Sequence, residues 1–102
     1  MSIKKKLLKD NKICKVTFEV PKQIGKTAKT IHIVGEFNNW DRSASPMKFT
    51  KEGKFTATID LQTGREYEFR YLLDEDRWAN ETEADKQVPT IYGDAYNSVI
   101  VL

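Results

Sequence analysis

The sequence predicts one all-β domain built as an antiparallel β-sandwich. Short segments in which apolar and polar residues alternate recur along the chain, and turn residues separate them. No long stretch shows the apolar spacing of an amphipathic helix. The 102 residues fit one domain, and no low-complexity linker divides them. Six or seven strands at this spacing supply two apolar faces that pack together as a sandwich.

The first half of the chain contains two predicted strands and a long connection. The first strand covers residues 13–20 and ends before Pro21. Four apolar residues share one of its faces: Cys14, Val16, Phe18 and Val20. The polar segment 22–29 predicts a loop, and the β-branched segment 30–34 predicts a second strand. Residues 35–46 are rich in Gly, Asn, Asp, Ser and Pro and predict a long loop.

The middle of the chain predicts two hairpin connections. A short strand at 47–50 leads into the turn at 51–54, which contains a glycine. Residues 55–61 alternate strictly and predict a strand. After a second glycine turn at 62–65, residues 66–73 predict another strand. Its apolar face carries Tyr67, Phe69, Tyr71 and Leu73.

The last third has a weaker pattern. Residues 74–76 are acidic and predict a turn before the short segment 77–79. Little pattern is visible over 80–93, where only 83–86 has the composition of a single helical turn. Residues 96–102 predict the closing strand.

Charge and composition disfavour several classes of function. The net charge is +2, from 17 basic and 15 acidic side chains, whereas nucleic-acid binders usually show a basic excess. No phosphate-binding glycine loop or cluster of metal ligands is present, so we expect no cofactor and no metal. The sole histidine, His32, is interpreted as a half-exposed strand residue. Cys14 is interpreted as a buried thiol, and only its neighbour Lys15 favours the reactive alternative.

Catalysis has little support in the sequence. With one histidine and one cysteine, a pair of nucleophile and base is hard to assemble. Composition alone does not exclude a glycosidase that uses a pair of carboxylates. The acidic residues 74–76, however, lie in a predicted turn and are interpreted as solvated. We therefore expect that the protein is not an enzyme.

The first residues predict a lead outside the domain. Residues 1–11 are basic and are expected to be solvated and in part disordered, with the domain spanning 12–102. Charged residues interrupt the apolar stretch that a signal peptide requires. No apolar run is long enough to cross a membrane. We expect a cytoplasmic protein with no membrane partner.

Both tryptophans stand in polar turns. Trp40 follows Asn38 and Asn39, and Trp78 follows the acidic turn. One interpretation is that each indole caps an end of the core. The other is that the two indoles form an exposed platform for sugars, because an indole covers the apolar C–H face of a pyranose ring. Planar groups such as those of Arg70 and Asn97 then bind the hydroxyl rim.

Three motifs, in order, resemble the signatures of carbohydrate-binding module family 48. They are Val34-Gly-Glu-Phe-Asn-Asn-Trp-Asp41 with Pro46-Met47, then Phe69-Arg-Tyr-Leu-Leu-Asp74 with Arg77-Trp78, then Tyr92-Gly93 with Asn97-Ser-Val-Ile-Val101. The chain is similar to isoamylase early-set domains, above all to small stand-alone bacterial ones, and to the glycogen-binding domain of AMP-activated protein kinase β subunits. The resemblance implies an immunoglobulin-like sandwich that binds α-1,4-glucan such as glycogen, starch or maltodextrin.

The resemblance also implies the site residues. Trp40 and Trp78 match the two sugar-stacking tryptophans, and Asn97 matches a sugar-binding asparagine. Arg70 stands where the kinase subunits have a lysine, and Tyr92 falls near a glucan-packing leucine. The turn before Trp78 is one residue longer than is usual in the family.

Two further interpretations accompany glucan binding. Many early-set domains bind no sugar and serve as docking parts, so a protein–protein interaction module of the same fold is the alternative. A glycogen-metabolism enzyme is the partner that the resemblance suggests. An enzyme or a nucleic-acid binder is the least favoured interpretation.

Overall fold

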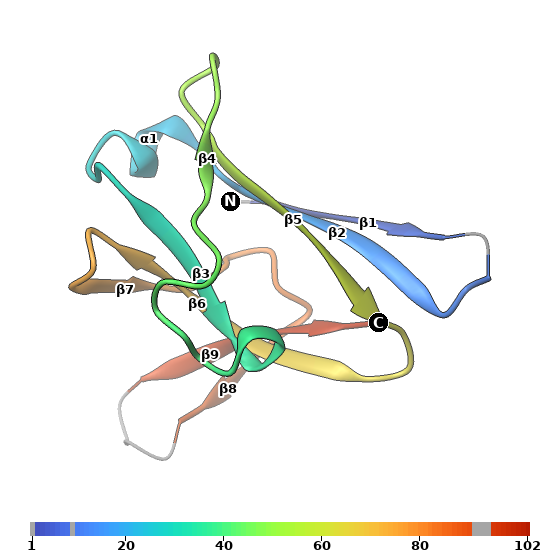
Figure 1. Ribbon diagram of the computed structural model, residues 1–102. Helices are drawn as coiled ribbons and strands as arrows, with labels where there is room; N and C mark the ends of the chain where they lie inside the picture. Colours follow the sequence, from blue (N-terminus) through green and yellow to red (C-terminus); the bar gives the residue numbers. More distant parts are fainter. Residues whose placement is uncertain (1, 9, 91–94) are drawn as a thin grey trace.

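Two antiparallel β-sheets pack face to face in the computed structural model (Figure 1). The structure describes residues 2–8, 10–90 and 95–102. Among these residues the first sheet has four strands, in the order β1 (Ser2–Leu7), β2 (Ile13–Val20), β5 (Phe55–Gln62) and β4 (Lys48–Phe49). The second has β3 (Ile31–Gly35), β6 (Glu66–Leu73), β9 (Tyr96–Val101) and β8 (Lys86–Pro89), with β7 (Arg77–Ala79) paired to the end of β6. The predicted all-β sandwich is confirmed.

The core lies between the sheets and follows the predicted alternation. The residues assigned to one face of β2 are 0–2% exposed, and those on the apolar face of β6 are 0–5% exposed. Phe18 of the first sheet meets Phe69 of the second edge to face, with ring centroids 5.1 Å apart. Burial of these side chains is the main stabilising term. Cys14 is buried, as expected from the sequence.

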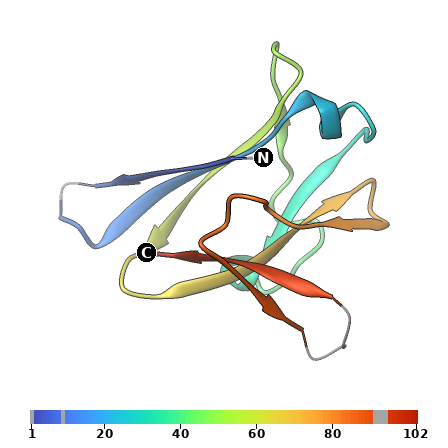
Figure 2. The same ribbon diagram turned by 180° about the vertical axis from the view of Figure 1, so that it is seen from behind.

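The edge of the first sheet differs from the prediction. The lead assigned to residues 1–11 does not lie outside the sandwich, because Ser2–Leu7 form β1 alongside β2 (Figures 1 and 2). Ile3 packs against the core. The Lys5 ammonium lies 2.7 Å from the Asp85 carboxylate near the second sheet. Backbone pairing and these two contacts hold a segment whose basic composition suggested a solvated lead.

Two short segments also differ from the prediction. The polar stretch expected to be a loop contains one helical turn, α1 (Lys22–Gly25). The helical turn expected at 83–86 does not form. The Asp85 N–H donates instead to Val99 O at 3.0 Å, and β8 begins at Lys86. Pairing with β9 overrides the weak local preference for helix.

A buried polar cluster holds the chain after β7. The Glu81 side chain is 0% exposed, and its carboxylate accepts hydrogen bonds from the Tyr71 hydroxyl at 2.7 Å and the Glu83 N–H at 3.0 Å. The Glu81 N–H donates to the buried Ser98 hydroxyl at 2.8 Å. Burial, followed by the Glu81 charge, raises the pKa of Tyr71 far above its ordinary value. The phenol therefore stays protonated and remains a donor.

None of the described helices is long and apolar enough to cross a membrane. The short helical elements are single turns.

Candidate functional site

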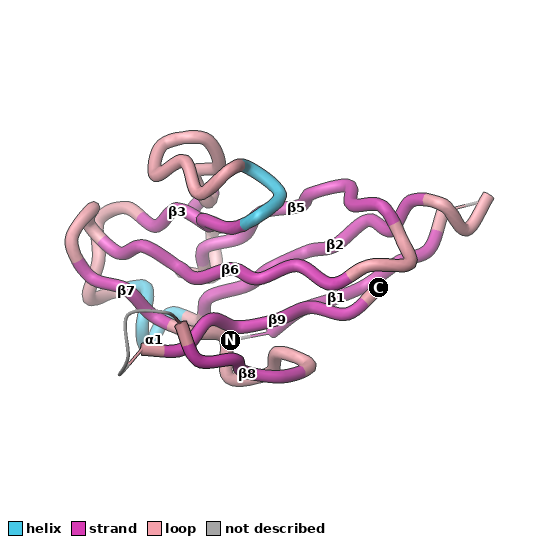
Figure 3. Tube along the Cα trace, turned by 90° about the horizontal axis from the view of Figure 1, so that it is seen from below, coloured by secondary structure: helices cyan, strands magenta, loops and turns pink. Residues whose placement is uncertain are grey.

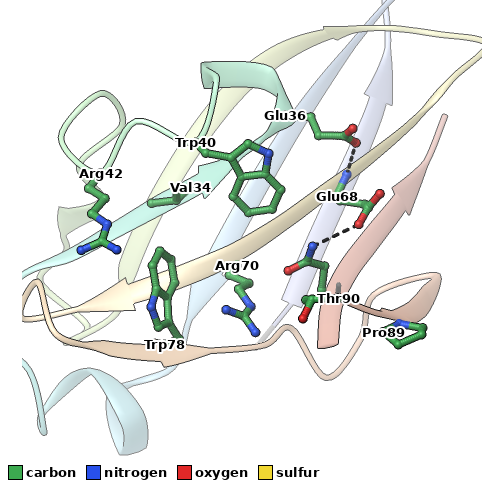
Figure 4. A pocket seen from close by; sticks show the side chains of 10 residues that line it. Val34, Glu36, Trp40, Arg42, Glu68, Arg70, Trp78, Pro89 and Thr90 are labelled. Atoms are coloured by element: carbon green, nitrogen blue, oxygen red, sulfur yellow. Dashed lines mark hydrogen bonds between the residues drawn. The ribbon is translucent and has the colours of Figure 1, made fainter. Parts of the chain in front are cut away.

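A groove of about 580 Å³ lies on the outer face of the second sheet (Figure 4). It draws residues from β3, β6, β7, β8 and β9 and from the connection after β3. Its lining comprises Val34, Glu36, Trp40, Arg42, Glu68, Arg70, Trp78, Pro89, Thr90 and Asn97. Aromatic rings, guanidinium groups, carboxylates and a carboxamide therefore meet at one surface.

Apolar residues lie on the same outer face as this groove. Val34, Leu72 and Val99 are 0–2% exposed but do not belong to the core cluster between the sheets. They alternate with core-facing neighbours, so they point to the outer face. Trp78 pairs directly with Leu72, which places both side chains on the same face. The outer face is therefore partly apolar, and Trp78 stands beside one of these residues, Leu72.

Trp40 is presented by the connection that leaves β3. A 3₁₀ turn, η1 (Glu36–Asn38), follows the end of β3, and the loop after it turns back alongside that strand (Figure 3). Asn39 and Trp40 both have left-handed backbones, with φ of 57° and 58°. This conformation is uncommon for a bulky residue and is held only where surrounding contacts fix it. The Trp40 N–H donates to Gly35 O at 2.9 Å, and the side chain is 39% exposed.

The Asn38 side chain fixes the loop that carries Trp40. Its Oδ1 accepts the Gly35 N–H at 3.0 Å, and its Nδ2 donates to Ile33 O at 2.9 Å and to Ser45 Oγ at 3.1 Å. Farther along, Asp41 Oδ1 accepts hydrogen bonds from the backbone and hydroxyl of Ser43. These bonds hold the pKa of Asp41 below its ordinary value.

We expect Asn38→Ala to destabilise the fold by about 2 kcal/mol, because three hydrogen bonds of a half-buried side chain are lost. The change should also make the Trp40 loop more mobile, expose its indole further and shift the tryptophan emission maximum to longer wavelength. Chemical denaturation and fluorescence measure both effects. Asn39→Gly is the matched control, since its backbone is already left-handed and its side chain is exposed. Equal stability of the two variants would contradict the role assigned to Asn38.

Trp78 reaches the groove through a tight hairpin between β6 and β7. Asp74 and Glu75 have φ of 52° and 68°, and the Asp76 N–H donates to Leu73 O at 3.2 Å. Positive φ at both central residues is typical of a type I′ turn. Beyond this turn Trp78 pairs directly with Leu72 of β6. The Trp78 side chain is 39% exposed.

The Asp74 carboxylate ties this hairpin to the rest of the sheet. Its Oδ1 accepts the N–H groups of Lys29 and Thr30, at 2.7 and 3.1 Å, and its Oδ2 pairs with Arg77 at 3.0 Å. The backbone hydrogen bond from Thr30, followed by that from Lys29, lowers the pKa of Asp74. The carboxylate therefore stays ionised, and the hairpin stays anchored, well into the acid range.

Two arginines lie against Trp78. The Cζ atoms of Arg42 and Arg70 are 5.4 and 5.5 Å from the centroid of its ring. Figure 4 shows the two guanidinium groups on the two sides of the indole. Arg70 is also tethered, because its Nε donates to Tyr96 O at 3.1 Å.

Two carboxylates occupy the other end of the groove (Figure 4). Glu36 Oε1 accepts the Glu68 N–H at 2.7 Å, and Glu68 Oε1 accepts a hydrogen bond from Asn97 Nδ2 at 3.0 Å. The Asn97 carboxamide is thereby oriented in the groove. The charge along the groove runs from positive at Trp78 to negative at Glu36 and Glu68.

Four of the five residues expected in the site line this groove: Trp40, Arg70, Trp78 and Asn97. The fifth, Tyr92, lies outside the described residues. Their contact with sugar remains a prediction. The groove is also lined by three charged residues that were not expected in the site: Glu36, Arg42 and Glu68. Alternation along β6 places Glu68 on the same face as Arg70, and this signal could have found it.

One family model matches the chain. It is described as the glycogen recognition site of AMP-activated protein kinase, and the match covers residues 15–102. The matched segment includes every groove residue. No curated protein matches the chain.

Proposed function

Because the chain belongs to the family of the glycogen recognition site of AMP-activated protein kinase, we propose that it binds α-1,4-glucan and performs no reaction on it. The observation that carries this proposal is the groove in which two half-exposed indoles stand beside a guanidinium and a carboxamide. Glycogen, starch and maltodextrin all present the required surface, which is a pyranose ring with an apolar C–H face and a rim of hydroxyls.

Each part of the groove has a role in this proposal. The indoles of Trp40 and Trp78 stack on successive glucosyl units and remove apolar area from water. Arg70 donates hydrogen bonds to hydroxyls, and the Asn97 carboxamide both donates and accepts. Because β-strands hold Arg70, Trp78 and Asn97, the groove is largely formed before sugar binds. Preorganisation of this kind reduces the cost of binding.

The groove carboxylates support a binding role without catalysis. Glu36 and Glu68 each accept a hydrogen bond that orders the groove, so both carboxylates have structural partners. A glycosidase needs one carboxyl group as acid and another as base or nucleophile. Prolonged incubation of the pure protein with maltoheptaose should release no reducing ends. The predicted partner enzyme and the predicted cytoplasmic location stay predictions.

A titration with maltoheptaose, followed by NMR at the two indole N–H signals, tests the proposal. We expect both signals to shift along one binding curve, because both rings line one groove. Affinity should be modest, since association entropy offsets much of the stacking gain. Cellohexaose, with the same glucose units in β-1,4 linkage, is the matched control and should cause far smaller shifts. Absence of any shift with saturating maltoheptaose would refute glucan binding and leave the docking interpretation.

A further inference from the structure

Two arginine side chains, Arg42 and Arg70, share the Trp78 end of the groove. Within the described part of the chain, ion pairs form at Lys5, Lys54, Arg77 and Lys86 but at neither Arg42 nor Arg70. The nearest acid in sequence, Asp41, points its Oδ1 at Ser43 instead. The groove acids Glu36 and Glu68 are engaged with a backbone N–H and with Asn97. Two guanidinium groups therefore share one indole, and among the described residues neither of them forms an ion pair.

A sugar that stacks on the face of Trp78 must displace one of these guanidinium groups. Arg70 is held by its hydrogen bond to Tyr96 O. Arg42 stands on the exposed loop after Trp40, and among the described residues its contact is the indole itself. A contact between a cation and an exposed indole is weak, so Arg42 is readily displaced. Of the two guanidinium groups, Arg42 is therefore the one that can turn toward a ligand in the groove.

We propose that this end of the groove binds a phosphate monoester carried by a glucosyl unit, so that the preferred ligand is a phosphorylated α-glucan. This inference rests on the proposed function. A guanidinium matches phosphate through paired N–H donors, and charge-assisted bonds are about twice as strong as neutral ones. A phosphate monoester carries about two negative charges at neutral pH, which balances Arg42 and Arg70 together. Neutral hydroxyls leave both charges uncompensated.

The experiment compares three ligands by calorimetry: maltoheptaose, maltoheptaose bearing one 6-phosphate ester, and inorganic phosphate. We expect the phosphorylated sugar to bind about tenfold more tightly than the neutral one at low salt. The advantage should shrink at high salt, because part of it is screened. In Arg42→Gln the ratio of the two affinities should fall to about twofold. Inorganic phosphate alone should bind much more weakly than the phosphorylated sugar.

Arg65→Gln is the matched control. Arg65 lies in the turn just before β6, over the Tyr67 ring at 4.9 Å, and lines a neighbouring depression rather than the groove. The affinity ratio of this variant should equal that of the wild type.

The remaining outcomes refute either the phosphate site or the proposed function. Equal affinity for the two sugars, or an advantage unchanged in Arg42→Gln, refutes the phosphate site and leaves neutral glucan binding intact. Inorganic phosphate binding as tightly as the phosphorylated sugar refutes recognition of a phosphorylated glucan. Failure of both sugars to bind refutes the proposed function itself.

Discussion

Trp78→Ala is expected to raise the Kd for maltoheptaose by about 30-fold, which corresponds to about 2 kcal/mol of lost apolar burial. The indole supplies a stacking face, and its removal also uncovers the apolar residue Leu72 beside it. The position of Arg70 should change as well, because its guanidinium rests against the same ring. Calorimetry of the wild type and the variant with the same sugar measures the effect.

The fold of this variant must be checked, since part of the Trp78 indole packs on the sheet. An NMR spectrum with native dispersion establishes that the domain is intact. Phe49→Ala is the control for loss of an exposed aromatic residue. Phe49 is 59% exposed on β4 of the other sheet, where its ring meets Phe55. Its loss should leave the Kd unchanged. If the folded Trp78→Ala protein binds maltoheptaose as tightly as the wild type, Trp78 does not stack on the sugar.

Gly35→Ala is expected to cost about 3 kcal/mol of folding free energy, a large part of the total for a small domain. A Cβ at this position would lie 2.6 Å from Glu68 O and 2.7 Å from Phe69 Cβ. The backbone at Gly35 is extended, with φ of −169°, so the effect is steric and not conformational. The β3–β6 pairing, in which Gly35 faces Phe69, leaves neither strand free to move apart.

A glycine can be required because a Cβ has no space or because the backbone is left-handed. Gly64→Ala tests the second reason by itself. Gly64 has φ of +81°, and a Cβ added there would meet no atom of the described residues within 4 Å. Its replacement should cost about 1 kcal/mol through left-handed strain alone. Denaturation with urea gives both values. A Gly35→Ala protein as stable as Gly64→Ala would show that β3 and β6 yield at this point.

The sequence did not predict the edge strand β1 or the burial of Glu81, because both depend on contacts between residues far apart in the chain. Nothing in the composition of residues 2–7 predicts a strand. Strand β1 forms because the edge of β2 is available for pairing and because Lys5 forms an ion pair with Asp85. The same holds for Glu81, which has the local sequence of a solvated turn. Tyr71, ten residues earlier in the chain, supplies the donor that makes its burial possible.

The amino-acid order by itself determined the strand alternation, the inward faces of β2 and β6 and the turns between strands. These properties follow from period-two side-chain geometry and turn chemistry, which act between near neighbours. Only the tertiary structure decided that Arg42 and Arg70 meet at Trp78 and that Glu68 orients Asn97. Partners across strands are set by register, and register comes from pairings between segments far apart in the chain.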